Sequence, residues 1–147
     1  MKLRGALSAL AVLILWVPSA RSEQPAPEVT LRKTELFALG GIGVAGSMSE
    51  GERALREVLK ESDLAARLEK LLSDASPAGQ LYALLGLRLR DRAAYERALQ
   101  KLRTTDAKVQ TARGCILQQE SFRDLVKEIE RGQYDNFLAR EWPKQAR

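Results

Sequence analysis

A glycine-rich segment at residues 40–46, GGIGVAG, contains the spacing G-x-G-x-x-G. In dinucleotide-binding proteins this spacing follows a strand and opens a helix whose N-terminus faces the pyrophosphate. Here the preceding apolar run LFAL is short, the first helix signal comes only at Ser49, and no βαβ pattern follows. We therefore expect no cofactor, and an irregular or extended stretch that packs against the rest of the fold. An anion-binding nest is an alternative that the charges of Glu50 and Glu52 oppose.

Few other side chains in the sequence could do chemistry. The chain has no histidine and one cysteine, Cys115. Catalysis by a histidine base and ordinary zinc sites are excluded, because each needs a histidine or several cysteines. No D-x-[DN]-x-[DN]-G calcium loop is present, so no metal is expected.

A hydrolase that uses two carboxylates remains possible as an enzyme class, because it needs only Asp and Glu. Several acids lie near expected loops: Glu50, Glu52, Glu61, Asp63, Asp91 and Glu120. Nothing in the sequence marks two of them as a buried pair. We therefore assign no catalytic residue.

The first 22 residues have the form of a secretory signal peptide. Lys2 and Arg4 precede an apolar run at residues 6–17, and small residues follow up to Ser22, where we expect cleavage. The alternative is an uncleaved anchor, but a membrane-spanning helix needs about 20 apolar residues. We therefore expect a periplasmic or secreted protein that contacts the membrane only through this signal before cleavage.

Charge and cysteine content limit the possible partners of the exported chain. Removal of the signal leaves 21 basic and 19 acidic residues, a balance of +2, so we expect no nucleic-acid partner. One cysteine allows no intramolecular disulfide. Because Cys115 is followed by Ile116 and Leu117, we expect a buried structural thiol. Intermolecular pairing or redox sensing is the alternative.

The chain divides into a leader, one domain and a short tail. Residues 23–30 contain two prolines and predict a flexible leader. Residues 31–142 are expected to form a single helical domain, and residues 143–147 a frayed tail. Whether residues 31–46 form a strand, a helix or an irregular segment stays open.

Helix signals recur from residue 49 onward. Ser49 and Glu52 form a capping box that predicts a helix over residues 50–60. Further helices are predicted after caps at Ser62 or Asp63, Ser76, Asp91 and Ser121. The helix after Ser76 has a broad apolar stripe, which predicts a central position. Residues 109–117 could be helical or extended.

Five short amphipathic helices indicate an all-α fold, in an orthogonal or HEAT-like arrangement. Within residues 76–102, Pro77 opens one expected helix and Asp91-Arg92 opens the next. This stretch resembles one unit of a HEAT-like helical hairpin. The resemblance implies a protein-binding scaffold.

We therefore expect an exported binding or scaffold module with a protein partner, and leave its oligomeric state open. The residues considered as an interaction surface are Arg88, Arg90, Arg92, Tyr134, Phe137 and Trp142. For the arginines the alternative is a solvated helix end, since basic residues there complement the helix dipole. The alternative function is a carboxylate-dependent hydrolase of an extracellular polymer.

Overall fold

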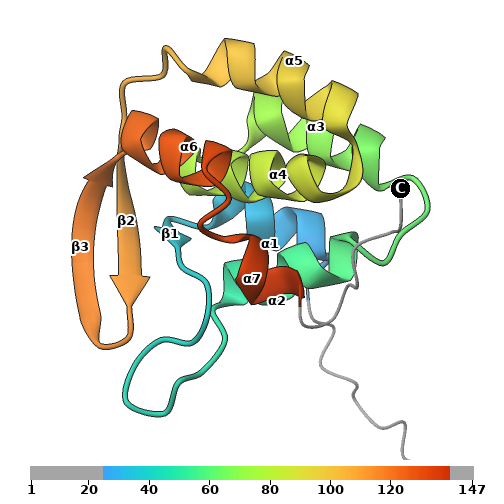
Figure 1. Cartoon of the computed structure of the whole chain (residues 1–147). Helices are drawn as coiled ribbons and strands as arrows, with labels where there is room; N and C mark the ends of the chain where they lie inside the picture. Colours follow the sequence, from blue (N-terminus) through green and yellow to red (C-terminus); the bar gives the residue numbers. More distant parts are fainter. Residues whose placement is uncertain (1–24, 140–147) are drawn as a thin grey trace, which may run out of the picture.

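The computed structural model describes residues 25–139 and places a small sheet beside a group of helices (Figure 1). The helices are α1 (Pro27–Lys33), α2 (Glu50–Val58), α3 (Leu64–Asp74), α4 (Pro77–Arg90), α5 (Arg92–Leu102), α6 (Phe122–Glu130) and α7 (Asp135–Ala139). The strands are β1 (Leu36–Phe37), β2 (Lys108–Arg113) and β3 (Ile116–Ser121). The expected signal peptide, Trp142 and the expected tail lie outside the described residues.

Helix α4 is the centre of the fold. Ser76 caps it by accepting the N–H of Gly79 at 3.1 Å, and proline follows at the first helical position. Every side chain from Leu81 to Leu87 is buried, and α4 contacts helices α1, α2, α3, α5 and α6 as well as strands β1 and β2. The central helix that the broad apolar stripe predicts is therefore confirmed.

Three of the five expected helix caps form, that of Ser76 among them, and two do not. Ser49 accepts the N–H of Glu52 at 3.0 Å, and Asp91 caps α5 in the same way. Asp63 and Ser121 precede helices as predicted but make no capping bond through their side chains. The apolar stripe, rather than the cap, therefore fixes the position of α3 and α6.

The first helix begins within the segment that the sequence predicts as a leader. Helix α1 starts at Pro27 and buries Leu31 completely. Its backbone lies so close to α4 that a Cβ atom on Gly79 would be 2.1 Å from the carbonyl oxygen of Leu31. Two prolines predict a flexible segment, but here the second one occupies the start of a helix, where its missing N–H costs nothing.

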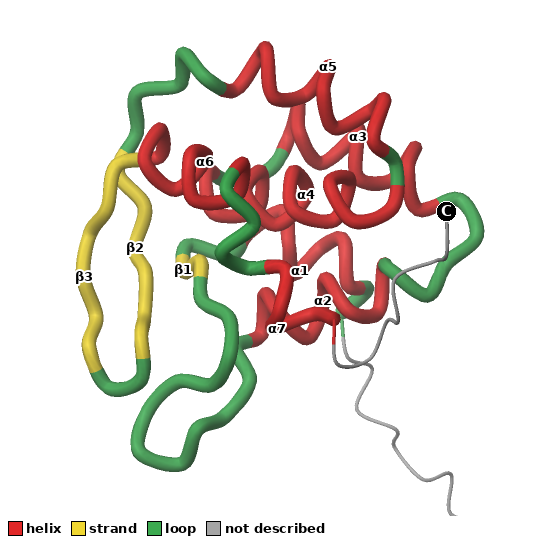
Figure 2. The backbone as a smooth tube through the Cα atoms, viewed as in Figure 1, coloured by secondary structure: helices red, strands yellow, loops and turns green. Residues whose placement is uncertain are grey.

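The expected all-α fold is wrong, because a three-stranded mixed sheet accompanies the helices (Figure 2). Strand β1 pairs in parallel with β2, with Phe37 opposite Thr111, and β2 pairs antiparallel with β3. Residues 109–117, which the sequence left ambiguous, form most of this hairpin. The β-branched Val109 and Thr111 alternate with polar residues and face inward, as expected of a half-buried strand.

Candidate functional site: an apolar apex braced by a buried polar network

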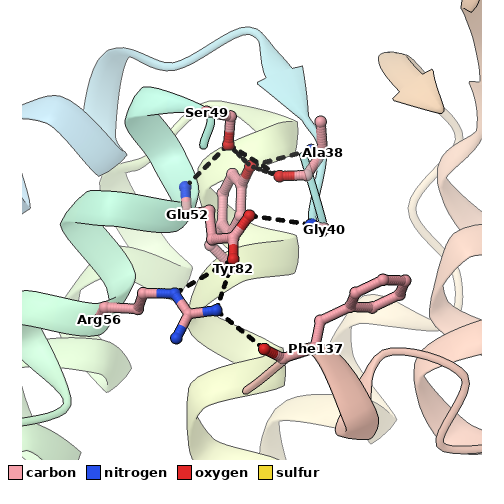
Figure 3. A network of polar contacts seen from close by, with 7 residues as sticks. All are labelled: Ala38, Gly40, Ser49, Glu52, Arg56, Tyr82 and Phe137. Carbon is pink, nitrogen blue, oxygen red and sulfur yellow. Dashed lines mark hydrogen bonds and ion pairs between the residues drawn. The ribbon is translucent and has the colours of Figure 1, made fainter. Parts of the chain in front are cut away.

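Ser49 and Tyr82 fix the start of the glycine-rich segment (Figure 3). Both hydroxyls donate to the carbonyl oxygen of Ala38, at 2.8 and 2.9 Å, and the N–H of Ala38 donates to the Tyr82 hydroxyl at 2.9 Å. Burial raises the pKa of Tyr82, so its hydroxyl stays neutral and can both donate and accept. A Cβ on Gly51 would lie 2.4 Å from the Tyr82 ring, so glycine is needed at this position.

Glu52 is a buried carboxylate, only 2% exposed, that joins three segments (Figure 3). It does not complete the expected capping box. Instead it accepts the N–H of Gly40 at 3.0 Å and the guanidinium of Arg56 at 2.6 Å. Arg56 also donates to the carbonyl oxygen of Phe137 at 2.8 Å. One ion pair therefore ties the glycine-rich segment and helix α7 to helix α2.

The glycine-rich segment turns back on itself instead of opening a helix. Ile42 and Ser47 exchange backbone hydrogen bonds of 2.8 and 2.9 Å, and the N–H of Gly46 donates to the carbonyl oxygen of Gly43. The N–H of Gly43 donates to the carbonyl oxygen of Gly114 in the β2–β3 turn at 2.8 Å. These amides donate to carbonyl oxygens of the protein itself. In a nucleotide-binding loop, by contrast, the backbone amides point together at a phosphate.

Exposed apolar side chains lie in the glycine-rich turn and at the start of β3, on either side of the bond between the two turns. Val44 is 99% exposed, Ile116 65% and Leu117 64%, and we call these three residues the apex. The glycine-rich segment was expected to pack against the core, but burial ends at Leu39, just before it, and none of residues 40–46 is buried. From residue 43 onward it projects from the fold beside the β2–β3 hairpin (Figure 1).

Cys115 lies in the β2–β3 turn and is exposed, so the expected buried thiol is wrong. Gly114 has φ +58°, and Cys115 does not have a positive φ. A glycine in the first central position is the pattern of a two-residue type II′ hairpin turn. In such a turn the side chain of the second central residue, here Cys115, points away from the core, although Ile116 and Leu117 follow it in the sequence.

Glu120 and Glu128 share Arg113, which brings two partly buried acids together. Arg113 lies 3.5 Å from Glu120 and 3.1 Å from Glu128. Burial alone would raise the pKa of Glu120, but hydrogen bonds from Thr111 and Gln118 and the charge of Arg113 hold it below its ordinary value. Catalytic proton donation needs a raised carboxyl pKa, so this pair is suited to holding the hairpin on α6.

Three of the other acids considered for hydrolysis are bound to different partners. Asp91 caps α5, Asp63 pairs with Arg67, and Glu52 is enclosed in its ion pair with Arg56. Among residues 25–139, no group of three or more Asp, Glu or Cys side chains is placed to hold a metal ion.

The arginines considered as an interaction surface differ in their exposure and in their partners. Arg88 and Arg92 lie near the ring of Tyr95, at 5.7 and 5.6 Å from its centroid. Arg88 is mostly buried and pairs with Asp135, whereas Arg92 is exposed and pairs with Glu96. Arg90 belongs to the last turn of α4.

Tyr134 and Phe137 are brought together at α7. Tyr134 donates a hydrogen bond to Glu128, and its pKa is raised by burial and by that bond. Phe137 is 41% exposed and lies between two open hollows of about 420 and 240 Å³. The charged side chains bordering these hollows are paired with each other, Glu52 with Arg56 and Glu128 with Arg113.

No family model, curated protein or solved structure matches this chain. Within the part of the chain that the structure describes, no helix has the length and apolar character needed to cross a bilayer. Sequence reasoning missed the apex because it depends on the contact between Gly43 and Gly114, which are far apart in the chain. The available signal was the pair Gly114-Cys115 between β-branched segments.

Proposed function

We propose that this chain is an exported binding module that takes a protein partner on its apex. The observation that carries the proposal is the exposure of Val44 in the glycine-rich turn and of Ile116 and Leu117 at the start of β3, two segments joined by the backbone hydrogen bond from Gly43 to Gly114. Exposed apolar side chains on a braced projection are typical of interaction sites, because leaving them in water is unfavourable unless a partner covers them.

Bracing adds to the case for binding. The Gly43–Gly114 bond and the Ile42–Ser47 pair hold both turns in place before any partner arrives. A preformed surface loses less conformational entropy on association than a mobile one. The carboxylate-dependent hydrolase has no comparable support, because the Glu120–Glu128 pair shares a cation and Glu120 has a lowered pKa.

The test compares partner capture by three forms of the tagged protein in its native host. In the apex variant, Val44, Ile116 and Leu117 are replaced by serine. The control, Leu89→Ser, removes an apolar side chain that is 36% exposed elsewhere, on α4. Both changes should leave the free energy of unfolding within about 0.5–1 kcal/mol of the wild type.

We expect the wild type and Leu89→Ser to retain the same partner, and the apex variant to lose it. Retention of that partner by the apex variant would overturn the proposal. So would capture of no protein by the wild type, or binding of the wild type to lipid vesicles in place of a protein.

A further inference from the structure

Strand β3 has an unpaired edge. The strand order is β1-β2-β3, so β3 has β2 on one side and, among the described residues, no strand on the other. Figure 2 shows β3 as the outermost segment on this side of the molecule. An unpaired strand edge offers a row of backbone donors and acceptors to any extended chain of suitable length.

The hairpin turn determines which backbone groups face outward. A two-residue turn is closed by hydrogen bonding between its flanking residues, here Arg113 and Ile116. Bonded and non-bonded pairs then alternate along an antiparallel ladder. The N–H and C=O groups of Leu117 and Gln119 therefore point away from β2.

The features that normally block pairing at a strand edge are missing from β3. Exposed strand edges in other proteins are commonly protected by a lysine, a proline or a bulge. Strand β3 reads ILQQES, and its register with β2 is unbroken from Ile116 to Ser121. Its one charged side chain, Glu120, accepts hydrogen bonds from Thr111 at 2.7 Å and from Gln118 at 2.8 Å, so it is held within the hairpin.

Ile116 and Leu117 are consecutive residues of a strand, so their side chains point to opposite faces of the sheet. A partner packed against one face could cover only one of them. A strand added at the edge of β3 places its own side chains beside both, since consecutive residues of the new strand also alternate between faces. The exposure of both residues is therefore best explained by edge pairing.

A second copy of this chain fits the edge poorly. Two-fold antiparallel pairing of β3 with itself requires identical residues to share a face, so Ile116 cannot lie opposite Leu117 of the other copy. If Leu117 lies opposite Leu117 of the other copy, Ile116 lies opposite Gln118 of that copy. Only a different sequence, with two consecutive apolar residues, places an apolar side chain opposite each.

We propose that β3 binds an extended segment of a partner protein as a fourth strand, with two consecutive large apolar residues opposite Ile116 and Leu117. This inference rests on the proposed function and names the form that the partner takes. Backbone hydrogen bonds supply the pairing, and the apolar pair supplies the preference for one sequence.

The test is selection of random displayed peptides, long enough to span the six residues of β3, on the purified protein. We expect the enriched peptides to lack proline and to share two consecutive large apolar residues. One of them is then synthesised, and its affinity is measured for Gln119→Pro and for the matched control Gln119→Thr. Proline at position 119 removes an outward N–H and leaves the hydrogen bonds between β2 and β3 intact. The affinity of the peptide for Gln119→Pro should therefore be lower than for Gln119→Thr by about tenfold or more.

Methylation of the peptide's backbone nitrogens on the side facing β3 is a second readout, independent of how well Gln119→Pro folds. It should abolish binding if the peptide pairs as a strand. The edge proposal is overturned if no peptide is enriched, if Gln119→Pro binds as well as Gln119→Thr, or if the methylated peptide binds normally. Loss of the native partner by the apex variant but not by Gln119→Pro would overturn edge pairing alone, whereas retention by both would overturn the proposed function as well.

Discussion

The ring of Phe137 fills the space that a side chain at position 40 would need. A Cβ atom on Gly40 would lie 2.2 Å from Cε1 of Phe137, and Gly40 also has φ +86°. The glycine-rich segment and α7 are thus matched at one contact. The ion pair of Glu52 with Arg56 supports the same contact, because Glu52 holds the N–H of Gly40 and Arg56 holds the carbonyl of Phe137.

Replacement of Gly40 by alanine should lower the free energy of unfolding by about 2–4 kcal/mol, from left-handed backbone strain together with displacement of the ring. Gly43→Ala is the matched control, since Gly43 has φ +70° but nothing within 4 Å of its Cβ position. It should show the backbone part alone, about 1–2 kcal/mol. Urea unfolding measures both, and in a Phe137→Ala background the difference between them should disappear. A difference that persists there would contradict the proposed contact.

Glu52→Gln should lower the free energy of unfolding by about 2–4 kcal/mol, because it leaves the mostly buried Arg56 without its counter-charge. The exposed pair of Asp63 and Arg67 supplies the comparison, and Asp63→Asn should cost about 1 kcal/mol or less. Hydrogen exchange should also show faster opening of α7 in Glu52→Gln. Equal effects of the two substitutions would mean that the buried pair does not brace this region.

The lowered pKa of Glu120 makes its contribution to stability dependent on pH. A carboxyl whose pKa is lower in the folded state stabilises the protein above its ordinary value of 4.5, and that stabilisation is lost as the pH falls through the folded pKa. The difference in unfolding free energy between wild type and Glu120→Gln should therefore be largest near neutral pH and shrink toward about pH 3. A difference that stays constant over this range would show that the charge of Glu120 is not stabilising.

Cys115 should react with a thiol reagent in the native protein as completely as in urea, because the hairpin turn exposes it. Absorbance after addition of a chromogenic disulfide measures this directly. A native thiol that reacts less completely than the thiol in urea would contradict the exposed position of Cys115 in the β2–β3 turn.

Helices α2 to α6 were predictable because their signals are local, whereas α1 and α7 were not predicted. Ser76 with Pro77, and Asp91 before α5, mark helix starts through bonds to residues three positions on. The sheet was not predictable in the same way. Strand β1 has two residues, and its pairing with β2 depends on a contact distant in sequence. Residues 109–117 could have formed a helix, which Gly114 would weaken, or a hairpin, whose turn Gly114 permits. The pairing of β2 with β3, which is not visible in the local sequence, selects the hairpin.

Part of the candidate site had a sequence signal, and part had none. Tyr134 and Phe137 were singled out as aromatic residues, and the structure brings both to α7 and its approach. Val44 had no such signal, because its exposure follows from the bond between Gly43 and Gly114. The buried position of Glu52 was equally hidden, since a glutamate at the third position of a helix normally completes a capping box.

The most direct test of the apex as an interaction surface is photo-crosslinking in living cells of the native host. A photoreactive residue is introduced as Val44→p-benzoylphenylalanine, with Leu89→p-benzoylphenylalanine as the matched control on α4. The account predicts a discrete protein adduct from position 44 and none from position 89. No adduct from position 44, or the same adducts from both positions, would contradict it.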